Sequence, residues 1–98
     1  MVALTEAMFY VLMAFRGEEI CGIEIAEYIE RHTSGRVKLG PATLYTILAK
    51  FEKERYIREL HVEGRKRTYQ ITEKGEKAYQ AELLRLKQCI EDAEALRF

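Results

Sequence analysis

Residues 41–72 read PATLYTILAKFEKERYIRELHVEGRKRTYQIT, and this stretch decides the fold. Its first part, residues 41–54, predicts a helix, because proline suits a first helical turn and apolar residues then recur at helical spacing. Its second part predicts two strands, residues 57–63 and 67–72, joined by a tight turn at Gly64-Arg65-Lys66. The segment therefore predicts a helix followed by a hairpin.

Apolar side chains define the buried side of both parts. On the helix they fall on one face, at Leu44, Ile47, Leu48 and Phe51. On the strands they alternate with polar residues, at Leu60, Val62, Tyr69 and Ile71. We expect these two sets to face one core.

Two helices precede this segment and one follows it. Thr5 can cap the first helix, which Gly17 ends, and the second runs from Cys21 to His32. Thr72 can cap the last helix, which reaches close to the C-terminus. The order helix, helix, helix, hairpin, long helix predicts an α+β fold that is mainly α: a winged helix-turn-helix with a two-stranded wing.

Both terminal helices carry apolar residues that favour a homodimer. The last helix has a coiled-coil seam of about two heptads, at Tyr79, Leu83, Leu86, Ile90 and Ala93. The first helix is apolar on all sides, since Phe9 and Met13 lie away from its core face, and such a helix is usually buried on more than one side. We therefore predict a dimer interface formed by these residues. The alternative is an amphipathic last helix that lies on its own core.

Charge is segregated along the chain. Residues 31–67 hold ten Lys/Arg against four Asp/Glu, although the formal net charge of the whole chain is zero. Residues 1–30 hold one basic and six acidic side chains, and residues 68–98 hold five and six. A local cationic excess of this kind is typical of a surface that binds nucleic acid.

The predicted helix at residues 41–54 has small residues in the middle of its polar face. Small side chains let a helix enter a DNA major groove, and Ala and Thr methyl groups can contact thymine. The cations of the hairpin turn suit phosphates. We assign base-edge contacts to Ala42, Thr43, Thr46 and Lys50, and phosphate contacts to Lys38, Tyr45, Lys53, Arg65, Lys66 and Arg67.

Each of these features has a simpler explanation. The helix face can be a solvent-exposed surface that happens to be rich in Ala and Thr, and a basic hairpin tip can merely discourage edge pairing. Because both features would face one duplex, we favour DNA binding. Residues 1–72 then form a winged-helix DNA-binding domain and residues 73–98 a dimerisation helix, within a single compact unit.

Three motifs resemble the PadR family of bacterial and archaeal transcriptional regulators. Ala42-Thr43-Leu44-Tyr45 is similar to the Gly-Thr-Leu-Tyr-Pro of the family's recognition helix, and residues 69–75, YQITEKG, are similar to its Tyr-x-Leu-Thr-x-x-Gly segment. Cys21-Gly22-Ile23-Glu24-Ile25 resembles its Gly-Tyr-Glu-Ile motif. The match spans nearly the whole chain and implies the branch with a single C-terminal helix that mediates dimerisation.

The resemblance also implies a small hydrophobic or aromatic effector at the dimer interface, where Phe9, Met13 and Tyr79 are candidates for its pocket. The chain departs from the family pattern at three positions. Ala42 replaces a glycine and Thr46 a proline, so the base preference can differ from that of other members. Arg55 stands where a helix-ending glycine is usual, and a non-glycine residue in a left-handed cap costs about 1 kcal/mol.

Other functions find little support. The chain has one serine, Ser34, and one aspartate, Asp92, and it has no glycine-rich phosphate loop, so we expect no enzyme. We expect no metal and no cofactor either. Cys21 and Cys89 have no redox or ligand spacing, although Cys21 near a helix N-terminus could instead be a reactive thiol.

The sequence lacks a signal peptide and a membrane span, which favours a cytoplasmic protein. Our prediction is a dimeric, sequence-specific DNA-binding transcriptional regulator that acts as a repressor on a palindromic operator. The alternative is a winged-helix module that binds an acidic protein partner and has no specific DNA target.

Overall fold

The computed structural model describes residues 4–17 and 19–96. Residues 1–3, 18 and 97–98 lie outside the described part, so the first residue of the predicted DNA-binding domain and the last of the predicted dimerisation helix are not covered. The elements are α1 (Glu6–Gly17), β1 (Ile20–Cys21), a 3₁₀ turn η1 (Gly22–Glu24), α2 (Ile25–His32), α3 (Pro41–Lys53), β2 (Ile57–Glu63), β3 (Lys66–Ile71) and α4 (Glu73–Ala95). The predicted mainly helical winged helix-turn-helix is confirmed.

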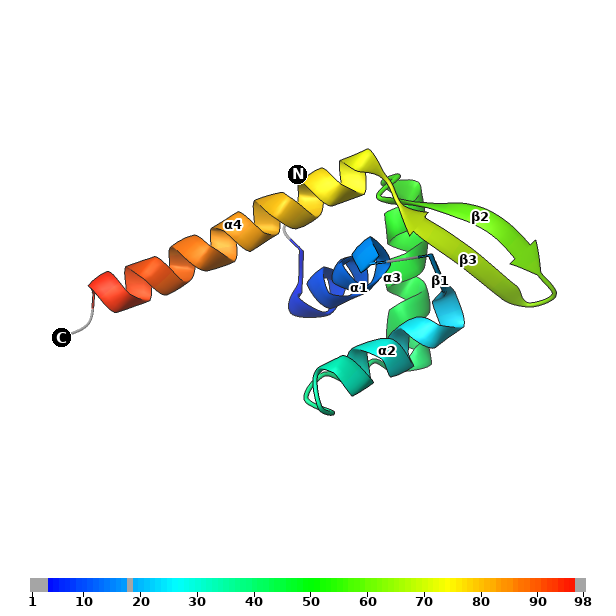
Figure 1. Ribbon diagram of the computed structural model, residues 1–98, viewed down its shortest axis with the longest axis horizontal. Coiled ribbons are helices and arrows are strands. Elements are labelled where there is room, and N and C mark those ends of the chain that lie inside the picture. Colours follow the sequence, from blue (N-terminus) through cyan, green and yellow to red (C-terminus); the bar gives the residue numbers. More distant parts are fainter. Residues whose placement is uncertain (1–3, 18, 97–98) are drawn as a thin grey trace.

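One core holds α1, α2, α3 and the base of the hairpin together. α3 stands at the centre, with α1 and α2 on one side of it and the β2–β3 wing on the other (Figure 1). The predicted apolar stripe of α3 is buried, and the largest fully buried side chains are Phe15, Phe51, Leu12, Ile25, Ile57 and Val11. The wing and most of α4 extend away from this core in opposite directions (Figure 1).

The sheet has three strands instead of the two predicted. Its order is β1-β3-β2, all antiparallel, and Ile20 and Cys21 pair with Tyr69 and Thr68 of β3. The second helix begins at Ile25, because Cys21 belongs to β1. The predicted start of this helix at Cys21 is therefore wrong. Cys21 is buried where β1 meets β3, so it is a packing residue of the sheet.

The alternating pattern predicted for β2 is also wrong in part. A β-bulge lies between Glu59 and His61, so Leu60 has no partner opposite it, and Val62 is 50% exposed. The cause is physical: a bulge breaks the alternation of side chains, and the tip of the hairpin extends past the core. Tyr69, by contrast, is buried as expected.

A compact junction fixes the direction in which α4 leaves the wing. Arg55 ends α3 in the left-handed conformation, with φ 63°, as its position predicted. The Thr72 hydroxyl donates to the Arg55 carbonyl at 2.6 Å and accepts from the Gly75 N–H at 3.0 Å, so it caps α4 and ties it to the end of α3. A Cβ at Gly75 would lie 2.1 Å from the Tyr56 carbonyl oxygen, so only glycine fits there.

The first half of α4 packs on α1. Phe9 and Tyr79 stack with ring centroids 5.0 Å apart, and the Arg16 guanidinium lies 4.3 Å from the Tyr79 ring while it pairs with Glu76 at 2.8 Å. The second buried side of α1, which we predicted to contact another subunit, is therefore covered at Phe9 by α4 of the same chain.

No described helix is both long enough and apolar enough to cross a membrane.

Candidate nucleic-acid interface

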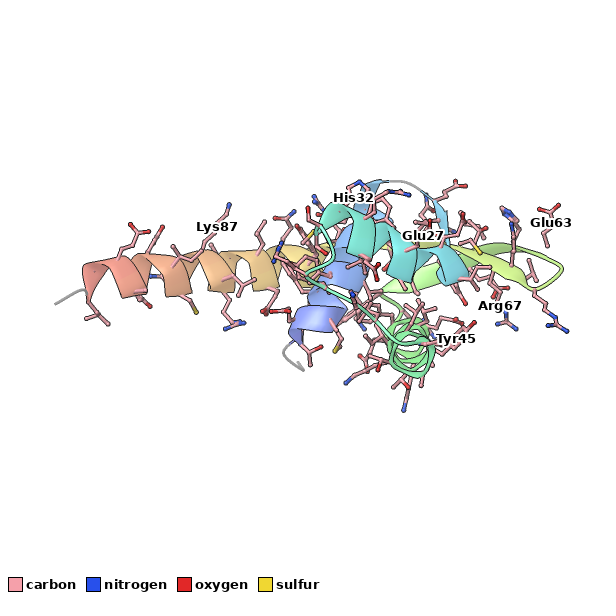
Figure 2. All side chains as sticks on the ribbon, turned by 90° about the horizontal axis from the view of Figure 1, so that it is seen from below. Glu27, His32, Tyr45, Glu63, Arg67 and Lys87 are labelled. Carbon is pink, nitrogen blue, oxygen red and sulfur yellow. The ribbon has the colours of Figure 1, made fainter. Side chains whose placement is uncertain are left out.

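The polar face of α3 is exposed at the surface of the molecule. Its buried face seats the helix on α1 and the sheet, which leaves the opposite face at the edge of the molecule (Figure 2). All the residues predicted for this surface are exposed: Lys38, Ala42, Thr43, Tyr45, Thr46, Lys50 and Lys53. The middle of the exposed face consists of short side chains, so a groove wall could approach the helix backbone closely.

Thr46 is held in one orientation by its own helix. Its hydroxyl donates to the Ala42 carbonyl at 2.9 Å. Because this bond uses the hydroxyl proton, a base edge would meet the Thr46 methyl group and the oxygen lone pairs. Those groups suit a thymine methyl or an amino group of adenine or cytosine.

The wing tip presents three cations, which are not equivalent. Gly64 adopts the left-handed turn conformation, with φ 63°, and Arg65, Lys66 and Arg67 that follow it are exposed. Arg67 pairs with Glu59 across the hairpin, with 3.4 Å between Nη1 and Oε2. Within the described part of the chain no ion pair involves Arg65 or Lys66. These two residues are therefore the cations most available to a phosphate.

The wing and α3 face the same side of the molecule. Figure 2 shows Tyr45 on the side of α3 nearest the wing and Arg67 projecting from the wing toward that same side. A hollow of about 300 Å³ lies between them, lined by Gly22, Ile23, Tyr45, Leu48, Ala49, Glu52, Arg65, Arg67 and Tyr69. The structure thus brings together the two parts of the predicted surface, which are far apart in the sequence.

Two acidic side chains beside the wing cations, Glu52 in this hollow and Glu59 on β2, are the part that sequence reasoning missed. Burial, together with the nearby Glu52 carboxylate, raises the pKa of Tyr69 to about 12, and Arg67 opposes the rise. Glu52 and Arg67 thus both lie near the Tyr69 hydroxyl, and Arg67 also pairs with Glu59 of β2. Only the strand register, which the bulge alters, brings Glu59 to Arg67, so no local sequence signal indicated the pair.

The residues predicted for a dimer interface fall into three groups by exposure. Phe9 and Tyr79 are buried in the core of the protomer, Met13, Leu83 and Leu86 are half-buried, and Ile90 and Ala93 are exposed. The rings of Phe9 and Tyr79 stack on each other within the protomer, and Met13 is the partly exposed member of the three residues suggested for an effector pocket. Among the described residues, no group of His, Cys, Asp or Glu side chains is arranged to hold a metal ion.

The fold and this surface define a winged-helix protein with a basic reading surface. The model of the transcriptional regulator PadR-like family matches residues 11–81. The chain belongs to this family, as its motifs indicated.

Solved structures of similar shape include members of the same family. A transcriptional regulator from Clostridium thermocellum is 25% identical, with a TM-score of 0.80 over 93% of this chain and 92% of that chain. A PadR-like transcription factor from Bacteroides fragilis has the same TM-score of 0.80 at 17% identity, over 93% and 89% of the two chains.

One structure of similar fold contains DNA. Bacillus subtilis PadR in complex with operator DNA has a TM-score of 0.70 at 21% identity, over 80% of this chain and 46% of that one. No curated protein matches the chain significantly.

Proposed function

We propose that this chain is a dimeric DNA-binding repressor that reads a palindromic operator with α3 and holds the phosphate backbone with its wing. One observation carries the proposal: Tyr45 of α3 and Arg67 of the wing lie on one side of the molecule (Figure 2), and the small residues of α3 and the cations of the wing tip are exposed. A convex helix flanked by cations fits a major groove and its phosphates. The operator complex of Bacillus subtilis PadR supports the same use of this fold.

In this proposal the exposed residues divide by function. Ala42, Thr43, Thr46 and Lys50 meet base edges, since they occupy the outward face of α3. Arg65 and Lys66 meet phosphates, and Lys38, Tyr45 and Lys53 flank the helix with further phosphate contacts. Arg67 contributes less than its neighbours, because Glu59 already neutralises part of its charge.

Dimerisation follows from the size of the reading surface. One α3 covers a single half-site, and a twofold dimer reads two half-sites in inverted orientation. The apolar residues that α4 leaves exposed or half-buried supply a surface for the second copy. A dimer bound to an operator beside a promoter represses transcription by blocking access to the promoter. An effector that changes the spacing of the two reading surfaces in the dimer would relieve this repression.

The experiment that tests this function is selection of bound sequences from a random duplex pool with the full chain. We expect enrichment of an inverted repeat whose half-sites are about one helical turn apart. The selected duplex should lose affinity steeply between about 50 and 200 mM salt. If no sequence is enriched and duplex binding is undetectable even at low salt, the alternative of a protein-binding winged helix is favoured instead.

A further inference from the structure

The hollow between α3 and the wing carries opposite charges that do not neutralise each other. Its lining includes the Glu52 carboxylate of α3 and the guanidinium groups of Arg65 and Arg67. Among the described residues, no ion pair involves Glu52 or Arg65. Arg67 pairs with Glu59 at 3.4 Å, but its side chain is 60% exposed, so this pair holds it only weakly. The hollow therefore offers a group for an anion and a group for a cation.

The two kinds of charge lie close together, beside a hydroxyl that is fixed in place. Glu52 and Arg67 both lie near the Tyr69 hydroxyl. The Tyr69 ring is 4% exposed and meets the Phe15 ring edge-on, with centroids 5.9 Å apart. A hydroxyl held in this way beside a carboxylate and a guanidinium, at the wall of a hollow, is typical of a binding site.

The rest of the lining is apolar and includes side chains that the protomer leaves partly open to solvent. Ile23 is 50% and Tyr45 is 57% exposed. Gly22 keeps the floor open, because a Cβ there would lie 3.1 Å from Leu48 Cδ1 and 3.3 Å from Tyr69 Cε2. An aromatic ring on this floor would lose apolar surface to water on one side and could stack on the Tyr45 ring.

We propose that this hollow binds a free α-amino acid with an aromatic side chain. The ligand carboxylate meets Arg65 and Arg67, its ammonium group meets Glu52, and its ring covers the apolar floor. An α-amino acid carries both charges on one carbon atom, which matches a carboxylate and a guanidinium that flank the same hydroxyl. A simple anion would face the Glu52 carboxylate and a simple cation would face the guanidinium groups, so both bind more weakly.

Binding at this hollow opposes DNA binding, and this consequence rests on the proposed function. Tyr45, Arg65 and Arg67 line the hollow and are also the residues assigned to phosphates. A ligand carboxylate on these guanidinium groups occupies the position that a phosphate needs, so the amino acid releases the operator. The site differs from an effector pocket at a dimer interface, because it lies within one protomer and on its reading surface.

The test uses L-tryptophan as the probe, because the chain contains no tryptophan and the indole emission reports the ligand alone. The full chain is titrated without DNA into a fixed low concentration of the probe, and the fluorescence anisotropy is recorded. We expect saturable binding. Tryptamine lacks the carboxylate and indole-3-propionate lacks the ammonium group, so each should bind at least about threefold more weakly. Equal binding of all three, or no binding of L-tryptophan at millimolar protein, overturns the proposal.

Glu52→Gln tests the ammonium contact. It should weaken binding of L-tryptophan several-fold and leave indole-3-propionate binding unchanged or stronger, which misfolding would not produce. Glu54→Gln is the matched control, because Glu54 follows α3 and lines a separate hollow beside α1 and α4. This control should keep the wild-type preference for L-tryptophan. If Glu52→Gln also keeps that preference, the assignment of the site is wrong.

Competition with DNA is measured separately, on the selected duplex. Excess L-tryptophan should lower the affinity of the wild-type chain for the duplex, and it should do so less for Glu52→Gln. If L-tryptophan binds the free chain but leaves duplex affinity unchanged, the release of the operator is wrong. If no duplex binds under any condition, the proposed function fails, while the titration without DNA still decides whether the amino-acid site exists.

Discussion

Arg55 shows how one residue can hold an unfavourable conformation because of its surroundings. Its φ of 63° is a region that suits glycine, and its carbonyl is held by the Thr72 hydroxyl at 2.6 Å. The left-handed turn lets the chain reverse from α3 into β2 within a few residues. The backbone contacts of this junction, and not the arginine side chain, fix the conformation.

Arg55→Gly should therefore raise the free energy of unfolding by about 1 kcal/mol, measured by urea denaturation. Glu54→Gly is the matched control, because Glu54 has ordinary helical angles of φ −79° and ψ −7° and glycine there should cost about 0.5–1 kcal/mol. Equal destabilisation by both variants would show that the arginine side chain stabilises the fold in another way.

Glu59 should restrain non-specific DNA binding by neutralising Arg67. Glu59→Gln frees the Arg67 guanidinium, so affinity for random duplex should rise several-fold and the slope of log affinity against log salt should steepen by up to about one. Fluorescence anisotropy at several salt concentrations measures both quantities.

A double-mutant cycle separates this effect from the simple loss of a negative charge. Glu63→Gln removes a carboxylate from the same strand, one that forms no ion pair among the described residues, so it gives the effect of charge alone. In an Arg67→Ala background, Glu59→Gln should have no larger effect than Glu63→Gln. A gain that persists undiminished in that background would argue against the pair.

The junction at the start of α4 depends on a close backbone approach. Gly75→Ala would place a Cβ 2.1 Å from the Tyr56 carbonyl oxygen and 2.9 Å from Ile71 Cγ1, so the helix would have to shift. We expect destabilisation of about 2 kcal/mol or more. Gly40→Ala is the control, because its Cβ would meet nothing within 4 Å, and its effect on the melting temperature should be clearly smaller.

At the scale of elements, sequence patterns predicted the helices and turns whose formation depends on interactions within a few residues. The bounds of α3, the hairpin turn and the Thr72 cap follow from proline, glycine and hydroxyl chemistry within a few residues. β1 could not be found in this way, because its two residues form a strand only through pairing with distant Tyr69 and Thr68. The bulge at Leu60 was missed for the same reason, since the opposite strand defines it.

The candidate site shows the same division. Exposure of the helix face and of the wing cations agreed with their polar patterning, whereas the ion pair of Arg67 with Glu59 depends on the register of two strands. The stacking of Phe9 on Tyr79 depends on how α4 crosses α1. Apolar residues on a helix indicate burial, but they do not indicate which chain supplies the cover.

At the scale of the whole molecule, charge and shape are divided between the middle and the ends. The cationic excess of residues 31–67 lies in α3, the wing and the segments beside them, while α1 and α4 supply the frame. The molecule is elongated, with extents of 56, 28 and 22 Å, because the wing and α4 extend to opposite sides. In our account the wing and α3 meet one duplex, and α4 places the second copy.

The most direct test of this account compares a wing variant with a helix variant on the selected duplex and on random duplex, over a range of salt. Arg65→Ala/Lys66→Ala should weaken binding to both duplexes alike and make the salt slope shallower by about one unit for each lost phosphate contact. Thr46→Leu should leave the slope unchanged and alter which sequence is preferred. Unchanged affinity and slope in the wing variant, or an unchanged preference in the helix variant, would contradict the division of function between wing and α3.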